Sequence, residues 1–274
     1  MPADPPVLLN WLTGCFGLPE EVGFKQGAFM NGPFLKPVVP LVSLCGVFIA
    51  CSSSAFGASV QKLVPLPQGA TLPVTLDRGL DVHRVKVGQP LTASLSQRVP
   101  LPDGAYLSKK AKLTGSVASY DGKTLGLRFN TLKLGHKSEP IEVSLVAAAL
   151  WLDVESTQEP LEASDRGLSN PANWTTMQIG RDEVYRGGWQ GTVYDQYSEP
   201  VGHADAYGVY AAPNAAGLTR AMGPFSTTAK GLYDLRWIDI VSPGGDGKPI
   251  IFGLSSPKWQ LHGQTAFLFE VSAQ

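Results

Sequence analysis

Cysteine is scarce in this chain and is confined to its beginning. Cys15, Cys45 and Cys51 all precede residue 58, and no cysteine follows them. The rest of the chain can therefore hold neither a disulfide framework nor a metal site built on thiolates. Its stability must come from packing.

An excess of positive charge is also lacking. The formal net charge is −1, from 22 Lys and Arg against 23 Asp and Glu. General nucleic-acid binding requires a basic face that neutralises phosphates. The only tight basic cluster is Lys109, Lys110 and Lys112, for which solvated turn lysines are the simpler interpretation. We therefore expect no nucleic-acid partner.

The motifs of common catalytic and cofactor sites are missing as well. The sequence contains no Gly-x-Ser-x-Gly nucleophile elbow, no Gly-x-x-x-x-Gly-Lys-Ser/Thr phosphate loop and no His-x-x-x-His pair. Glycines at 244, 245 and 247 precede Lys248, but this segment links two expected strands instead of opening a helix, which argues against a phosphate cradle. We predict no catalytic residue, no cofactor and no metal.

Histidine and acidic side chains leave two weaker hypotheses open. Asp81 with His83, or His203 with Asp205, would share one face of an extended segment, so either pair could join a metal site if a third ligand came from elsewhere. Glycoside hydrolysis needs two carboxylates about 5–10 Å apart. The candidates near the aromatic segment described below are Asp182, Glu183, Asp195 and Asp205. Ordinary surface and turn residues are the simpler interpretation in each case.

Residues 30–58 have the layout of a secretory signal peptide. Lys36 supplies a positive charge, Val38 to Ala50 supply an apolar run, and small residues follow, so cleavage is expected after Gly57 or Ala58. The run of about 13 residues is shorter than the roughly 20 that a membrane-spanning helix needs. The protein is therefore expected to be exported to the periplasm or beyond, with membrane contact only through an uncleaved leader.

Two further features concern the processing of the N-terminal region. Cys51 follows Phe48-Ile49-Ala50, which loosely resembles a lipoprotein box, so lipidation with outer-membrane association is an alternative. Residues 1–29 precede the leader, although a signal peptide rarely begins so far into a chain. Met30 is a plausible true start, and residues 1–29 are expected to be a non-native or disordered extension.

What the sequence has in abundance is strand alternation, with 30 Gly and 22 Pro that favour turns. Between residues 91 and 149 apolar side chains recur at every second position, which is typical of strands with one buried face. Turn residues such as Pro102-Asp103-Gly104 and Asp121-Gly122-Lys123 separate these runs. The prediction is an all-β fold, an antiparallel small barrel or sandwich, with its first module at residues 59–150.

The second half of the chain is expected to add more sheet. Residues 151–182 show little periodicity and are predicted to form a long loop. Residues 183–274 are expected to be either a second β unit or the completion of the same sheet system. Within them, strands are predicted at Leu232–Val241, Pro249–Leu254 and Ala266–Val271.

A resemblance supports the barrel interpretation of residues 70–150. The segments that carry it are Leu72–Leu80, Gly88, Leu91–Leu95, Val99, Tyr106–Gly115 and Leu125–Leu132. In their order they resemble the periplasmic β-barrel domain of TrbI-like channel proteins of type IV secretion, and a group of uncharacterised exported bacterial proteins that carry only this module. Where that family usually has Pro, Gly and Ser, this chain has Ser108, Lys110 and Ala111. The resemblance implies a β-barrel-like module in the bacterial cell envelope.

Aromatic residues gather between 185 and 210 among glycines. The candidate binding residues are Tyr185, Trp189, Tyr194, Tyr197 and Tyr207. Exposed rings beside glycine and aspartate could stack on the sugar rings of a glycan, because Tyr and Trp offer an apolar face and a polar tip. The alternative is that these rings fill a β core, since aromatic residues are enriched in strands.

These patterns favour a non-enzymatic exported protein that acts as a structural or protein-interaction module of the cell envelope. The alternative is a glycan- or peptidoglycan-binding β module that uses the aromatic segment, and a glycoside or ester hydrolase is a third hypothesis. An envelope protein or a glycan is the expected partner. The sequence gives no prediction of the oligomeric state.

Overall fold

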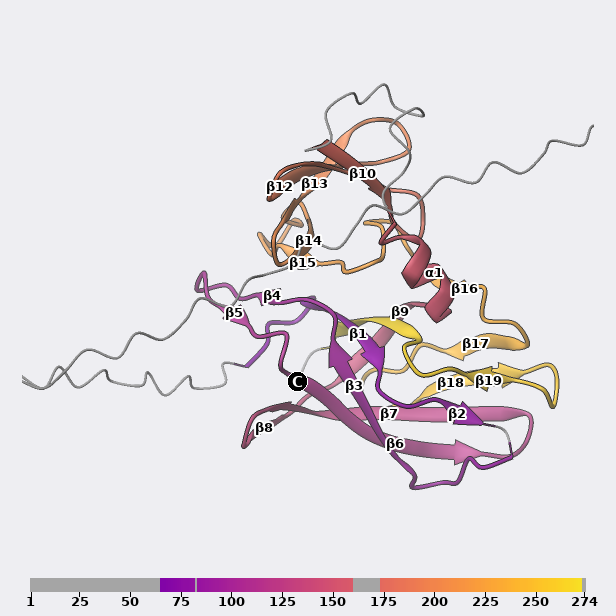
Figure 1. Ribbon diagram of the computed structural model, residues 1–274. Helices are drawn as coiled ribbons and strands as arrows, with labels where there is room; N and C mark the ends of the chain where they lie inside the picture. The colour runs from indigo at the N-terminus through magenta and orange to yellow at the C-terminus, as the bar shows by residue number, and fades with distance from the viewer. Residues whose placement is uncertain (1–64, 82, 160–172, 273–274) are drawn as a thin grey trace, which may run out of the picture. The chain divides into compact units, whose positions relative to one another are not determined.

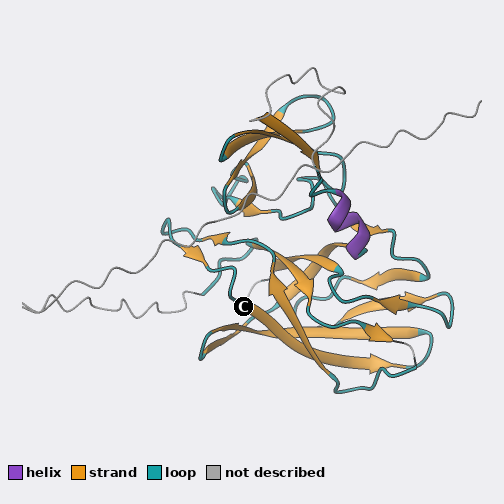
Figure 2. Cartoon of the chain, in the orientation of Figure 1, coloured by secondary structure: helices purple, strands orange, loops and turns teal. Residues whose placement is uncertain are grey.

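The computed structural model describes residues 65–81, 83–159 and 173–272. The predicted extension at 1–29, the signal peptide at 30–58 and Cys51 lie outside these ranges. Strands are the main regular structure of the described residues, and the one helix among them is the short α1 (Trp151–Ser156) (Figures 1 and 2). The prediction of an all-β fold is confirmed. No helix in the described part of the chain is long and apolar enough to cross a membrane.

The larger of the two main sheets has ten strands. They are β1 (Thr71–Leu76), β3 (Pro90–Leu95), β6 (Lys112–Tyr120), β7 (Thr124–Leu134), β8 (Lys137–Pro140), β9 (Val143–Ala149), β16 (Gly231–Tyr233), β17 (Ile238–Ser242), β18 (Ile250–Leu254) and β20 (Ala266–Val271). Their order is β16-β9-β20-β1-β3-β6-β7-β18-β17, and β8 pairs with β7. Neighbours are antiparallel except β16 and β9, which run parallel.

This sheet must curl into a nearly closed barrel because of how its edges are connected. β16 and β17 stand at opposite ends of the strand order, yet only residues 234–237 lie between them in the chain. In a flat sheet the nine strands along this path would hold them roughly 38 Å apart, since neighbouring strands are about 4.8 Å apart. An extended connection from Tyr233 to Ile238 spans at most roughly 18 Å. The edges therefore approach one another.

The barrel interior is filled by the alternating side chains that the sequence predicts. Leu91, Ala93 and Leu95 are buried along β3, and Phe129 packs its ring against Phe269 with centroids 5.2 Å apart. β20 is buried on both faces, more than an alternating strand requires. Its second face packs in a separate cluster that includes Met222, Phe225 and Ala229.

The second main sheet has six strands in sequential order. They are β10 (Asn173–Met177), β11 (Glu183–Gly187), β12 (Gln190–Tyr194), β13 (Pro200–Asp205), β14 (Gly208–Ala211) and β15 (Arg220–Ala221). A small core of Val184, Val193 and Ala204 lies on one of its faces. Two short pairs complete the sheets: β2 (Leu80–Asp81) with β19 (Gln260–Leu261), and β4 (Val99–Pro100) with β5 (Tyr106–Leu107).

Side chains from the barrel sheet and the segment after β3 bind the backbone of the six-stranded sheet and the turn after it. The Gln97 amide oxygen accepts hydrogen bonds from the N–H groups of Val209 (2.9 Å) and Gly223 (3.0 Å), and its amide nitrogen donates to the Val209 carbonyl (2.8 Å). The Thr71 hydroxyl donates to the Ala221 carbonyl at 2.6 Å. Gln97 and Thr71 are buried, so these bonds satisfy groups that would otherwise lose water without replacement.

Two predicted segments differ from the observed elements. The stretch 151–182, predicted as a loop, contains α1 and β10. The predicted strand Leu232–Val241 is interrupted by residues 234–237, where Asp234 (φ 50°) and Trp237 (φ 69°) adopt left-handed backbone. Apolar spacing does not reveal such a break, because Leu232, Ile238 and Ile240 keep the alternation on either side of it.

Candidate functional site

The exposure of the aromatic segment is decided by its turns. Trp189 lies in the β11–β12 turn, Tyr197 in the β12–β13 turn and Tyr207 in the β13–β14 turn. Successive turns of an antiparallel meander alternate between the two ends of the sheet, so Trp189 and Tyr207 share one end and Tyr197 lies at the other. All three rings are exposed, at 79% for Trp189, 61% for Tyr207 and 76% for Tyr197.

The two candidate binding tyrosines that lie within strands are neither core nor freely exposed. Tyr185 of β11 and Tyr194 of β12 are half-buried, and their rings meet edge to face with centroids 5.4 Å apart. The Tyr185 hydroxyl donates to the Glu183 carboxylate at 3.2 Å. The ring that fills the core is Tyr210 of β14, at 1% exposure, which stacks on His203 at 5.2 Å. Neither the binding interpretation nor the core interpretation describes the whole aromatic segment.

An arginine from the segment just before β4 organises one end of the six-stranded sheet. The guanidinium carbon of Arg98 lies 4.0 Å from the ring centroid of Tyr106 and 3.7 Å from that of Tyr207. One guanidinium nitrogen binds the Asp205 carboxylate at 2.6 Å, and the Nε group donates to the Tyr210 hydroxyl at 3.2 Å. Four contacts thus fix a planar cation between two aromatic rings.

The electrostatics of this group follow from the same contacts. Burial opposes the charge on Arg98, but its hydrogen bonds to Tyr210 and Asp205 prevail and raise its pKa. Burial also raises the pKa of the Tyr210 phenol, which therefore stays neutral and can accept the Nε–H hydrogen bond. The cation under Tyr106 and Tyr207 is permanent, and it holds both rings in place while each keeps exposed surface.

The four carboxylates considered for hydrolysis have structural partners. Asp182, which is buried, accepts hydrogen bonds from both the N–H and the hydroxyl of Thr227 at 2.7 Å. Asp195 accepts from two backbone N–H groups of its own turn, and Asp205 combines such turn bonds with the Arg98 ion pair. Glu183 accepts from Tyr185. The structure thus uses each of them to fix a turn or a neighbouring side chain.

The two histidine–aspartate pairs are also placed by local contacts. The Asp81 carboxylate accepts the backbone N–H of His83 at 2.8 Å, which is a turn interaction. His203 stacks on Tyr210, whereas Asp205 binds Arg98. Within residues 65–81, 83–159 and 173–272, no three His, Cys, Asp or Glu residues gather in a way that could hold a metal ion.

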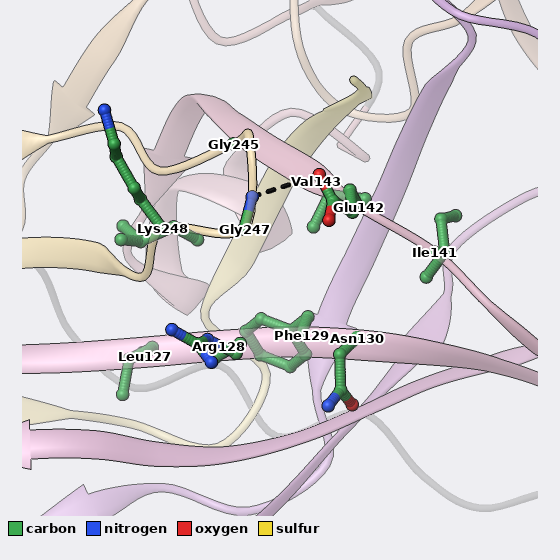
Figure 3. A pocket seen from close by; sticks show the side chains of 11 residues that line it. Leu127, Arg128, Phe129, Asn130, Ile141, Glu142, Val143, Gly245, Gly247 and Lys248 are labelled. Carbon is green, nitrogen blue, oxygen red and sulfur yellow. Dashed lines mark hydrogen bonds between the residues drawn. The ribbon is translucent and has the colours of Figure 1, made fainter. Parts of the chain in front are cut away.

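A small pocket opens in the barrel wall where β7, the start of β9 and the glycine-rich turn before β18 meet (Figure 3). It measures about 180 Å³, with apolar side chains such as Leu127 and Val143 and a polar rim that includes Arg128 and Lys248. The Glu142 carboxylate accepts the Gly247 N–H at 3.0 Å. A carboxylate of the chain itself thus holds this turn N–H.

The structure also contains a pair of acidic side chains that the sequence did not predict. Asp153 of α1 and Asp234 of the β16–β17 connection bring their carboxyl groups together, although they are far apart in the chain. Burial, and then repulsion from Asp234, raise the pKa of Asp153. No local motif marks such a pair, because the parallel pairing of β9 with β16 brings together the segments that follow these two strands.

Comparison with known proteins adds no relative: no family model, no curated protein and no solved structure matches this chain. The resemblance to the TrbI-like barrel domain therefore stays a prediction from the residues that carry it.

Of the five predicted binding residues, the structure brings Trp189 and Tyr207 to one end of a sheet. Sequence reasoning missed Arg98 and Tyr106, since nothing in their own segment points to an aromatic residue more than a hundred positions away.

Proposed function

We propose that this protein is a non-enzymatic binding module of the bacterial cell envelope and that it binds a glycan. The leader-like residues 30–58 support export, and the strand content supports a scaffold role. The glycan-binding surface is the end of the six-stranded sheet that carries Trp189 and Tyr207, with Tyr106 beside them.

The observation that carries this proposal is the exposure of the rings on the turns. A soluble protein gains stability by burying Trp, yet Trp189 is among the most exposed large side chains of the described residues. Flat aromatic faces stack well on the C–H face of a sugar ring, and their polar tips can bind its hydroxyls. The β11–β12 and β13–β14 turns are two strand spacings apart, or roughly 10 Å, so one oligosaccharide can reach both.

The contact of the Arg98 guanidinium with the Tyr207 ring supports the same function. A ligand that must order a mobile side chain loses affinity, whereas a ring already held by a cation costs little to engage. The Arg98 guanidinium packs on the rings of Tyr207 and Tyr106 and leaves part of each residue exposed. This is a preorganised stacking surface.

The test is retention of the full chain on purified peptidoglycan and on a glycan array. Trp189→Ala and Tyr207→Ala should each abolish retention. Tyr197→Ala is the matched control, because it removes an equally exposed ring from the opposite end of the sheet and should leave retention unchanged. Trp189→Ala should also leave the melting temperature unchanged; a large loss of stability would assign that ring to the core and refute the proposal.

A protein ligand is the second candidate function, favoured by the presence of Trp, Tyr and Arg together, which are the residues enriched in interface hot spots. Protein binding is the conclusion if the full chain is retained on no glycan and Trp189→Ala removes a specific crosslink to an envelope protein.

A further inference from the structure

A cleft of about 390 Å³ opens beside Tyr207 and is lined by residues of both main sheets and of α1. Its volume falls in the range of roughly 300–1,000 Å³ that is typical of small-molecule sites. Tyr207 connects it to the aromatic surface described above, since this residue lines the cleft and its ring lies on Arg98. A ligand on the aromatic surface therefore has an adjoining cavity to enter.

The lining of the cleft is rich in hydroxyl and amide groups. Ser94 and Ser96 each donate a hydrogen bond to the protein, to the Asp77 carboxylate (2.6 Å) and the Pro73 carbonyl (3.1 Å) respectively. Each hydroxyl oxygen keeps lone pairs that can accept a bond from a ligand. Gln97 lines the cleft with an amide already fixed by Val209 and Gly223, so this part of the wall is rigid.

One buried acceptor in the wall has no partner among the described residues. Gln178 is 5% exposed, and its amide nitrogen donates to the carbonyls of Gly223 (3.0 Å) and Phe225 (2.8 Å). Its Oε1 atom accepts no hydrogen bond from the described residues. This atom has almost no accessible surface, so it belongs to the wall behind the cleft and not to the surface that a ligand touches.

The charge of the cleft is set by one residue. Lys109 is the only charged side chain among those that line it. The two ion pairs within the described ranges are Arg98–Asp205 and Lys112–Asp77, so Lys109 has no acidic partner there. A cavity whose walls combine apolar surface with neutral hydroxyl and amide groups, and which carries one unpaired ammonium group, complements a ligand with an apolar face, hydroxyls and a single negative charge.

We propose that this cleft binds a sugar unit that carries a carboxylate, with the ring stacked on Tyr207 and the carboxylate bound by Lys109. The inference rests on the proposed glycan binding and deepens it by naming the ligand class. The hydroxyl oxygens of Ser94 and Ser96 accept hydrogen bonds from the sugar hydroxyls. The sugar enters as the end or a branch of a longer chain whose neighbouring units lie on Trp189.

The test uses D-glucuronic acid as the probe and D-glucose as its neutral counterpart, titrated into the full chain by calorimetry. Glucuronic acid should bind about fivefold more tightly than glucose, the effect of one partly exposed ion pair. Lys109→Met should remove this preference. Lys110→Met is the matched control, because that lysine is adjacent and exposed but does not line the cleft, and it should keep the preference.

The outcomes separate this inference from the function on which it rests. If Trp189→Ala abolishes retention on the glycan while glucuronic acid and glucose bind equally, or if neither binds, the acidic-sugar cleft is refuted and the aromatic surface stands. The cleft is also refuted if Lys110→Met lowers the preference as much as Lys109→Met. If Trp189→Ala keeps retention while the Lys109-dependent preference holds, the aromatic surface is refuted and the cleft stands.

Discussion

Replacing Arg98 by alanine removes the contact that organises the candidate site, and the structure allows the cost to be worked out. The ion pair with Asp205 has side chains that are 25% exposed on both sides, so it should contribute about 1 kcal/mol at most. Two cation–π contacts add about 0.5–1 kcal/mol each at such exposure. The hydrogen bond to the neutral Tyr210 hydroxyl adds about 1 kcal/mol.

These contributions are not independent, because one guanidinium makes all of them. We therefore expect Arg98→Ala to lower the free energy of unfolding by about 2 kcal/mol, below the simple total. Arg98→Lys keeps the charge but loses the planar fork, and it should recover less than half of that loss. Equilibrium unfolding in urea, followed by fluorescence, measures both variants against the parent protein.

A double-mutant cycle of Arg98→Ala with Asp205→Asn isolates the ion pair. Its coupling energy should be about 1 kcal/mol and should shrink as salt is raised from 0.05 to 0.5 M, since partly exposed charges are screened. The reasoning is refuted if Arg98→Ala changes the free energy of unfolding by less than about 0.5 kcal/mol, the size of an ordinary surface substitution.

Three further predictions concern other parts of the fold. Because the pKa of Asp153 is raised, the stability that this side chain contributes should be complete below about pH 4 and be lost as the pH rises through the raised pKa; the melting temperature of Asp153→Asn, which mimics the protonated acid, should therefore gain on that of the parent protein from pH 3 to 7. Gly115→Ala should cost about 1–3 kcal/mol in chemical unfolding, because a Cβ there overlaps the Arg128 carbonyl across the β6–β7 pair, whereas Gly263→Ala, whose Cβ would meet no atom nearer than 3.6 Å, should cost less. Asp182→Ala should cost about 1–2 kcal/mol by the same measurement, since it leaves the two Thr227 donors of a half-buried turn without their acceptor.

The strands were largely predictable because their signal is local. Leu125, Leu127 and Phe129 alternate in sequence and all point into the barrel, and Asp121-Gly122-Lys123 forms the turn before them. β10 was missed because Asn173–Met177 has no apolar alternation to reveal it. The interruption at 234–237 was missed because it depends on the barrel edges meeting, which no short window of sequence contains.

The candidate site was less predictable, because exposure depends on the position of a ring relative to the turns. Gly188 and Trp189 form the turn between β11 and β12, so the alternation of buried and exposed residues does not continue from one strand to the next through Trp189. Val193 is fully buried and Trp189 is exposed for this reason. The aromatic and glycine content of its segment predicts Tyr207 as a binding residue. Its contact with Arg98 forms only in the folded chain and could not be predicted.

The central claim is that the sheet end with Trp189 and Tyr207 binds a glycan. Amide and indole NMR shifts of the full chain, recorded while a soluble peptidoglycan oligosaccharide is added, test it directly. The account predicts shifts at the Trp189 indole and around Tyr207, with none at the opposite turn that holds Tyr197. Shifts centred on Tyr197, or no shifts at saturating oligosaccharide, would contradict it.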